Sequence, residues 1–195
     1  MFRASNKLRW VHAISSGVDM FLYDEFVRSD VVLTSEKGLV GEHLADTGFG
    51  LLLSLTRQIA RAIRYGADGW NHRPEMRFQE VELTGLTMGV FGFGGTGRAM
   101  AKRAKAFGMN VIAIDREDVG NSPEVDRVME SSEFRSFLEQ SDVVSICCPL
   151  TKETRGKFDA KAFAIMKDSA FLVNVTRGEV MSEADLVFAL ENGAI

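Results

Sequence analysis

The strongest constraint on the fold is a glycine-rich turn placed between an apolar run and the start of an amphipathic segment. Residues 92–97 read Gly-Phe-Gly-Gly-Thr-Gly and follow the apolar residues 88–91. Glycines at these spacings let a strand turn sharply into a helix whose first backbone amides are free to bind phosphate. A P-loop is excluded, because Arg98 and Ala99 stand where that motif needs Lys and then Ser or Thr. The pattern predicts a strand–turn–helix unit with an anion-binding turn.

Each residue of the turn has its own expected role. Gly92 permits the tight turn, Gly94 lets the backbone approach a pyrophosphate, and Gly97 allows the helix and strand to pack closely. Gly95 and Thr96 begin the helix, so we expect their amides to face the phosphate. A tight turn without any ligand would use the same glycines, and the residues that follow must decide between the two.

The acidic residue Asp115 ends the next predicted strand, at about the spacing where dinucleotide-binding folds place a carboxylate. A carboxylate there accepts hydrogen bonds from the adenosine ribose and repels a 2′-phosphate. The sequence therefore favours a bound dinucleotide, and NAD over NADP. Arg116 leaves NADP open, because an arginine near the ribose can accommodate the additional phosphate.

Strand and helix patterns alternate through the second half of the chain. Expected strands cover residues 87–92, 110–115, 142–147 and 170–175, and expected helices cover residues 95–107, 132–140, 159–166 and 182–190. The last helix begins with Ser182 and Asp185 in the arrangement of a capping box. Apolar strands separated by helices predict a Rossmann-type α/β fold, a doubly wound parallel sheet covered on both faces.

The segment before residue 36 is too small to bury a core of its own. It contains two expected strands (8–14 and 30–33) and one expected helix (19–28). We therefore expect residues 1–35 to be the remnant of a second α/β domain, and residues 36–195 to form the dinucleotide-binding domain. A single long helix over residues 40–65 should open the second domain, followed by a loop over residues 68–82.

Composition excludes several other classes of function. The net charge of −4 gives no concentrated basic face, which argues against nucleic acid as a partner. The most apolar stretch, residues 49–55, is too short to span a membrane, and residues 1–7 lead into no signal-peptide core. Cys147 and Cys148 are adjacent, which suits two small buried hydrophobes better than a disulfide or metal site. This cysteine usage predicts a reducing compartment, the cytoplasm.

Three separated segments closely resemble the D-2-hydroxyacid dehydrogenases, a family that includes phosphoglycerate, glycerate and hydroxypyruvate enzymes. The segments are residues 82–116, 148–156 and 174–178, and the resemblance extends upstream to about Leu8. It implies an NAD-dependent oxidoreductase that moves a hydride between the nicotinamide ring and C2 of a 2-oxo or 2-hydroxy acid. It also implies a homodimer formed through the dinucleotide domain and the helix over residues 40–65.

The resemblance assigns roles to individual residues. It implies that Arg177 binds the carboxylate and carbonyl oxygen of the acid. Residue type and position alone leave a surface ion pair with a nearby acid, such as Glu179, equally open. It implies that the loop containing Ser16 and Gly17 presents backbone amides to the same carboxylate. The cofactor contacts that it further implies are Cys148, Pro149, Thr154, Val175 and Thr176.

The proton-transfer residues of the family have no match in the chain. The family's histidine and its partner glutamate lie downstream of the segment that matches residues 186–195, and His12, His43 and His72 fit no part of that motif. We therefore expect the 195-residue chain by itself to bind NAD weakly and to turn over negligibly. A non-catalytic NAD(H) sensor and a dimerisation module stay open as alternatives, and the sequence does not select one acid.

Overall fold

The computed structural model describes residues 5, 7–120 and 122–195, and these residues form two parallel sheets. Most of residues 1–7, where the sequence contains no apolar signal core, therefore lie outside the described part. The smaller sheet pairs β1 (Trp10–Ala13) with β2 (Val32–Ser35). The larger sheet contains β3 (Thr87–Phe91), β4 (Asn110–Ile114), β5 (Arg127–Met129), β6 (Val143–Ile146) and β7 (Phe171–Asn174).

The larger sheet has the strand order β5-β4-β3-β6-β7, with every pairing parallel. The chain builds outward from β3 to β5 and then returns to the other side of β3 with β6. Strand order therefore reverses between β3 and β6, and the crevice at their carboxyl ends is where ligands bind in such sheets. This topology confirms the predicted doubly wound fold. The sequence did not indicate β5, a short strand at the sheet edge with Arg127 and Val128 exposed.

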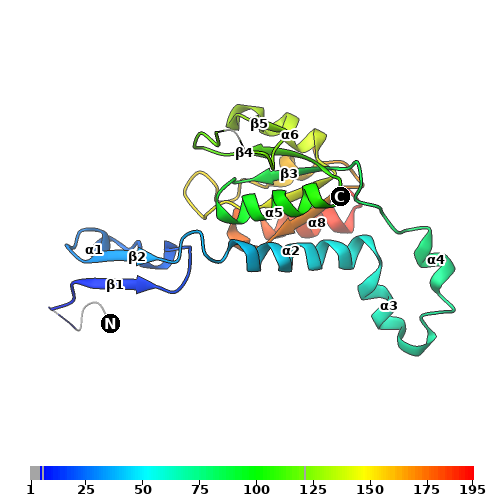
Figure 1. Ribbon diagram of the computed structural model, residues 1–195, viewed down its shortest axis with the longest axis horizontal. Helices are drawn as coiled ribbons and strands as arrows, with labels where there is room; N and C mark the ends of the chain where they lie inside the picture. Colours follow the sequence, from blue (N-terminus) through cyan, green and yellow to red (C-terminus); the bar gives the residue numbers. More distant parts are fainter. Residues whose placement is uncertain (1–4, 6, 121) are drawn as a thin grey trace.

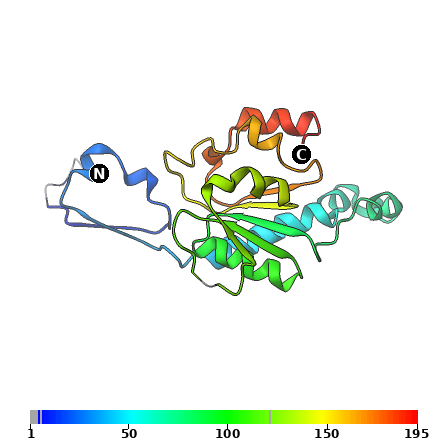
Figure 2. The same cartoon turned by 90° about the horizontal axis from the view of Figure 1, so that it is seen from above.

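Helices cover both faces of the larger sheet (Figure 2). One face is covered by α2 (Gly41–Thr56) and α5 (Gly95–Ala106), and the other by α6 (Phe134–Gln140), α7 (Ala160–Phe163) and α8 (Glu183–Glu191). Each face has its own apolar core, the first including Phe49 and Met100 and the second Phe137 and Phe163. Because both faces are buried, the central strands carry continuous apolar runs.

The single helix expected over residues 40–65 is wrong. The helix α2 ends at Thr56, and α3 (Ile59–Tyr65) starts after Gln58, which has a left-handed φ of 56°. The backbone N–H of Val81 donates to the Thr56 carbonyl at 2.9 Å, so the returning chain satisfies the end of α2. This long-range contact has no local signal in the apolar periodicity, which continues through the break.

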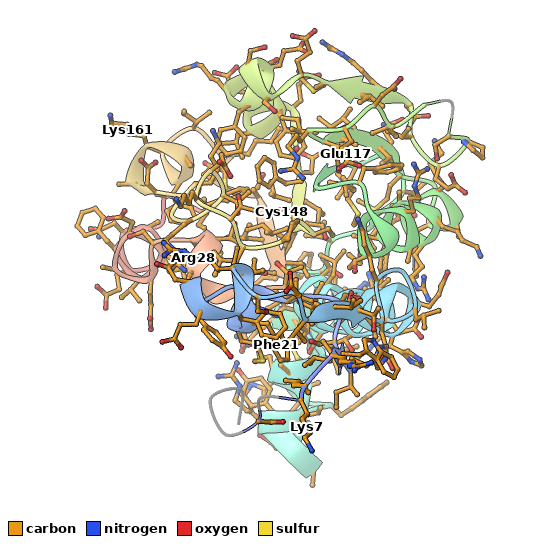
Figure 3. The ribbon with its side chains drawn as sticks, turned by 90° about the vertical axis from the view of Figure 1, so that its left-hand side faces the viewer. Lys7, Phe21, Arg28, Glu117, Cys148 and Lys161 are labelled. Atoms are coloured by element: carbon orange, nitrogen blue, oxygen red, sulfur yellow. The ribbon has the colours of Figure 1, made fainter. Side chains whose placement is uncertain are left out.

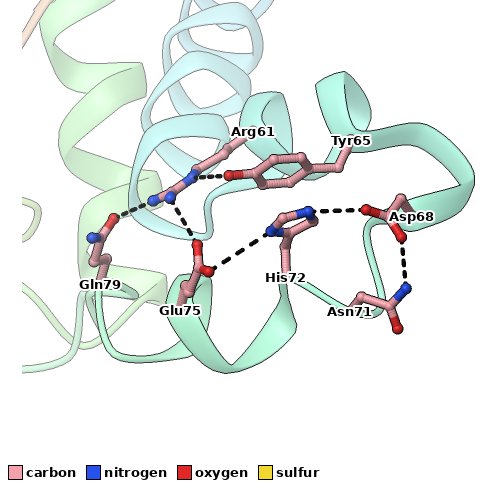
Figure 4. A network of polar contacts seen from close by, with 7 residues as sticks. All are labelled: Arg61, Tyr65, Asp68, Asn71, His72, Glu75 and Gln79. Atoms are coloured by element: carbon pink, nitrogen blue, oxygen red, sulfur yellow. Dashed lines mark hydrogen bonds and ion pairs between the residues drawn. The ribbon is translucent and has the colours of Figure 1, made fainter.

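The prediction of a loop over residues 68–82 is also wrong in part. This segment contains the helix α4 (Arg73–Arg77), which follows the short 3-10 helix η3 (Gly66–Asp68). Residues 57–82, which we call the arm, project from the end of α2 away from the sheets (Figure 1). His72 stacks on Tyr65 with ring centroids 3.8 Å apart, and its Nε2 lies 3.0 Å from Asp68 Oδ2 (Figure 4). The arm is thus held largely by its own polar contacts.

Smaller differences concern helix ends. The helix expected over residues 159–166 shortens to α7, which Asp159 caps by accepting from the amides of Lys161 and Ala162. Ser182 makes no side-chain cap on α8, and Asp185 accepts from Ala160 N at 3.0 Å instead, so the predicted capping box is wrong. Where a helix was expected over residues 132–140, the short 3-10 helix η4 (Ser131–Glu133) comes first and α6 follows it.

In the upstream segment, β1 and β2 pair with each other, and the chain between them forms η2 (Asp19–Phe21) and α1 (Asp24–Val27). These two short helices replace the single helix expected over residues 19–28. This small sheet lies at the opposite end of the molecule from the arm (Figure 1). Residues 36–40 then lead into α2. No helix in the described ranges combines the length and apolar character needed to traverse a bilayer.

Candidate functional site

The glycine turn joins β3 to α5 at the carboxyl edge of the larger sheet. Gly92 has φ +96°, and a Cβ at this position would lie 2.6 Å from the Cys148 backbone. A Cβ on Gly97 would overlap the carbonyl oxygen of Gly92. Both glycines are therefore required by the packing of the chain itself, one for the turn and one for the close approach of α5 to β3.

Gly94 differs from these two glycines. Nothing described lies within 4 Å of the point where its Cβ would be, and its φ is −74°. Internal packing thus gives no reason for glycine at this position, which faces open space at the start of α5. The first amides of an α-helix have no partner within the helix, and here they belong to Gly95, Thr96 and Gly97. An open backbone beside free amides fits a pyrophosphate.

Asp115 follows β4 and contacts the glycine turn directly. One of its carboxylate oxygens accepts from the amide of Phe93, and the other accepts from the amide of Glu117 at 2.9 Å. A carboxylate has about four acceptor positions, so these two bonds leave capacity for hydroxyl donors. The guanidinium of Arg116 is exposed and lies 3.6 Å from Glu117 Oε1.

The segment after β6 closes the site beside the turn. Cys147 donates from its amide to the Phe91 carbonyl at 2.8 Å, and the Cys148 backbone lies against Gly92. Figure 3, which views the molecule from the end with the smaller sheet, shows Cys148 near its centre. Burial raises the pKa of the Cys148 thiol to about 11, so it stays protonated and unreactive at neutral pH. Thr154 Oγ1 donates to the Pro149 carbonyl at 2.7 Å, which fixes the loop between them.

The residues after β7 are held by Asn174. Its Oδ1 accepts from the amide and hydroxyl of Thr176 at 2.9 and 3.0 Å, and its Nδ2 donates to the Arg177 carbonyl at 2.9 Å. Val175 points to α2, where its Cγ1 lies 3.4 Å from the position that a Gly48 Cβ would take. The sequence did not indicate the role of Asn174, since an amide ending a strand has no distinctive spacing.

Arg177 joins the two sheets. Its Nη2 donates to Asp19 Oδ1 at 3.0 Å, and its Nε lies 3.4 Å from Asp19 Oδ2. The hydrogen bond from Arg177 lowers the pKa of Asp19 below its usual value. Arg177 thus pairs with an acid, as the alternative expected, but the partner is Asp19 and not Glu179, which lies 4.0 Å from Arg155. Asp19 follows β1, so the carboxyl ends of the two sheets face each other across this ion pair.

The loop between β1 and Asp19 contains the predicted acid-binding residues. Ser16 Oγ donates to the Glu36 carbonyl at 3.0 Å, which ties the loop to the start of the segment leading into α2. A Cβ on Gly17 would overlap Arg177 Nη2. Gly17 therefore lies against Arg177 together with Asp19, which the predicted set did not include, whereas the glycine turn, Asp115 and Cys148 form a second cluster of contacts.

The comparisons with known proteins identify the family of the chain. The family model for the NAD binding domain of the D-isomer specific 2-hydroxyacid dehydrogenases matches residues 49–195. The chain belongs to this family. The match and the strand order together confirm both the predicted Rossmann-type fold and the resemblance seen in the sequence.

Individual members of the dehydrogenase family are similar over nearly the whole chain. The chain is 34% identical over 196 residues to the glyoxylate reductase of Thermococcus litoralis, covering 97% of this chain and 58% of the relative. It is 30% identical over 196 residues to the hydroxypyruvate reductase of Thermotoga maritima, covering 100% and 62%. A family protein from Aeromonas salmonicida superposes with a TM-score of 0.80 at 32% identity, covering 97% and 59%. The chain thus spans about three fifths of the length of these relatives.

The family model describes an NAD binding domain, and the glycine turn after β3 and Arg177 after β7 both lie at the carboxyl edge of the larger sheet. The glycine turn supplies free backbone amides, and Asp115 supplies a carboxylate that contacts the turn. Arg177 supplies a fixed positive charge at the end of β7. Such a site can bind a dinucleotide and orient a small carboxylic acid against it.

Proposed function

We propose that this chain supplies the cofactor-binding half of an NAD-dependent D-2-hydroxyacid dehydrogenase. The observation that carries the proposal is the position of Arg177, which lies against Gly17 and Asp19 at the same sheet edge as the glycine turn. A cation fixed beside a dinucleotide-binding turn suits a 2-oxo or 2-hydroxy acid. Residues 1–35 belong, in this proposal, to the substrate domain, and residues 36–195 to the NAD-binding domain.

NAD, when bound, supplies the hydride acceptor or donor. The amides of Gly95 and Thr96 bind its pyrophosphate, and Asp115 accepts from the adenosine ribose. The loop with Cys148, Pro149 and Thr154, together with the backbone of Val175 and Thr176, lines the rest of the cofactor site. Arg116, exposed beside Glu117, contributes to the ribose end of that site.

The acid is held by charge and by backbone donors. Arg177 orients its carboxylate and stabilises negative charge on the reacting oxygen, and the amides of the Ser16–Gly17 loop bind the same carboxylate. Proton transfer is assigned to no residue of this chain. His12 Nδ1 lies 2.9 Å from Thr34 Oγ1 and His72 lies in the arm, so neither is part of the site.

Two further proposals concern the protein partner and the cellular compartment. We propose a homodimer in which the exposed Leu51 and Leu55 of α2 and Ile59 and Ile63 of α3 are covered by a second copy. The buried free thiols of Cys147 and Cys148 suit a cytoplasmic protein. With a net charge of −4 and no long apolar helix among the described residues, neither nucleic acid nor a membrane is proposed as a partner.

The cofactor half is tested by calorimetric titration of the chain with NADH and with NADPH. We expect saturable binding of NADH, tighter than that of NADPH, and a loss of about tenfold in NADH affinity for Gly94→Ala, because the added methyl group enters the open space at the turn. Gly50→Ala is the matched control, since its Cβ also meets nothing within 4 Å but lies on α2. No saturable NADH signal from the wild-type chain would overturn the proposal.

The acid half is tested with oxamate, an unreactive analogue of a 2-oxo acid, added to the NADH-saturated chain. We expect saturable binding that Arg177→Leu removes while NADH affinity stays unchanged. Equal oxamate binding by Arg177→Leu would show that the acid site lies elsewhere.

A further inference from the structure

The guanidinium of Arg177 is held on one side and open on the other. A guanidinium has five N–H donors arranged as a planar fork. Asp19 takes the donors on Nη2 and Nε, at 3.0 and 3.4 Å, and the Thr176 carbonyl lies 3.4 Å from Nη1. Within the described part of the chain, two of the five N–H groups have no acceptor.

The covalent geometry of the arginine side chain determines which N–H donors of Arg177 remain open. The N–H of Nε and one N–H of Nη2 form the lateral edge of the fork, and this is the edge that the Asp19 carboxylate occupies. The remaining N–H of Nη2 points, with one from Nη1, along the terminal edge. A carboxylate or a carbonyl oxygen can bind that terminal edge with two parallel hydrogen bonds.

Gly17 makes this pairing possible. A Cβ at this position would overlap Nη2 and would lie 3.1 Å from both Arg177 Cζ and Asp19 Oδ1. The φ of Gly17 is not left-handed, so the backbone does not demand glycine. The missing side chain instead gives the guanidinium room to reach Asp19.

We propose that Asp19 is a positioning residue for Arg177, which by holding the lateral edge of the guanidinium presents its terminal edge to the carboxylate of a 2-oxo acid. This inference rests on the proposed function, because it takes the acid as the ligand. Side chains of arginine have several rotatable bonds, and fixing one of them before binding removes an entropic cost that the ligand would otherwise bear.

If Asp19 acted only through its charge, the change in anion affinity on removing it would have the opposite direction. The carboxylate of Asp19 is ionised at neutral pH, since the hydrogen bond from Arg177 lowers its pKa. If its only effect were its negative charge, removing that charge would strengthen the binding of an anion. If Asp19 positions Arg177, removing it weakens the binding of the same anion. The direction of the change therefore separates the two.

The experiment compares oxamate affinity in the NADH-saturated chain for the wild type, Asp19→Ala, Asp19→Asn and Glu179→Gln. Glu179→Gln is the charge-matched control, because it removes a negative charge two residues from Arg177 at a side chain that pairs with Arg155. NADH affinity and the midpoint of thermal unfolding are measured for each variant, so that damage to the fold is visible separately.

We expect Asp19→Ala to lose at least about tenfold in oxamate affinity, and Asp19→Asn, which keeps one acceptor, to lose about threefold. Glu179→Gln should equal the wild type, and NADH affinity should be the same in all four. Oxamate binding by Asp19→Ala or Asp19→Asn that is as tight as the wild type, or tighter, overturns the positioning role and leaves the proposed function intact. A wild-type chain that binds NADH but not oxamate overturns both the positioning role and the acid half of the proposed function.

Discussion

The two sheets of the molecule share parallel pairing but differ in how they are stabilised. In the larger sheet, β3 and β6 are buried along almost their full length, and helices cover both faces. In the smaller sheet, Trp10 is 61% exposed and Val32 57% exposed, and no described helix covers these side chains. Burial of apolar area is the main favourable term in folding, so the larger sheet is the rigid part of the site.

The smaller sheet depends more on polar contacts. Thr34 Oγ1 accepts from Trp10 Nε1 at 2.9 Å and lies 2.9 Å from His12 Nδ1, all on an exposed surface. Arg177 and Asp19 then connect this sheet to the larger one. Because the loop proposed to bind the acid belongs to the less buried sheet, the proposed cofactor edge is fixed by packing, whereas that loop is held by the Arg177–Asp19 ion pair and the hydrogen bond from Ser16 to the Glu36 carbonyl. The following predictions test this difference.

The largest effect is expected in the larger sheet, for Gly97→Ala. The added Cβ would overlap the Gly92 carbonyl, which is backbone and cannot move aside cheaply. We expect the free energy of unfolding, measured with urea, to fall by about 3–5 kcal/mol. Gly94→Ala, whose Cβ meets nothing within 4 Å, is the control and should cost about 1 kcal/mol or less. Equal losses for the two would mean that the close approach of α5 to β3 does not limit stability.

The same difference between local packing and long-range contacts explains which features could be predicted from the sequence. The glycine turn, the alternating elements and the approximate position of Arg177 could be predicted, because each depends on the spacing of nearby residues and on apolar runs along the sequence. The break at Gln58 and the pairing of Arg177 with Asp19 could not. Both depend on contacts between distant residues, Val81 with Thr56 and residue 177 with residue 19, for which one sequence has no periodic signal.

A smaller effect is expected in the smaller sheet, for Thr34→Val. The substitution keeps the shape of the side chain but removes the contacts of its hydroxyl with Trp10 and His12. Exposed hydrogen bonds are worth about 1 kcal/mol in total here, so amide hydrogen exchange in β1 and β2 should quicken by roughly fivefold. Exchange in β3 and β6 should not change.

Thr47→Val is the matched control, because its hydroxyl donates only to the His43 carbonyl within α2 at 3.1 Å. It should leave exchange in β1 and β2 as in the wild type. If Thr34→Val also left that exchange unchanged, the polar contacts would not be what holds the smaller sheet.

The arm extends the comparison to a third region, and here the expected effect is smallest and depends on pH. The hydrogen bond from Asn71, and then that from His72, lowers the pKa of the exposed Asp68 below 3.8 (Figure 4). A group whose pKa is lower in the folded state contributes stability above its unfolded pKa and loses it as the pH falls through the folded value. The arm contacts should therefore persist at neutral pH and weaken only under strongly acidic conditions.

Asn71→Ala removes the first of these bonds, so the pKa of Asp68 should rise toward 3.8 and the contact with His72 should be lost at a higher pH. Carboxyl carbon shifts of Asp68, followed by NMR during an acid titration, report the change. Asn192→Ala serves as the control, because that side chain donates to the Phe188 carbonyl in α8 and touches no carboxylate. An unchanged Asp68 titration in Asn71→Ala would mean that the hydrogen bond from Asn71 does not lower the pKa of Asp68 and that the contact with His72 accounts for the shift.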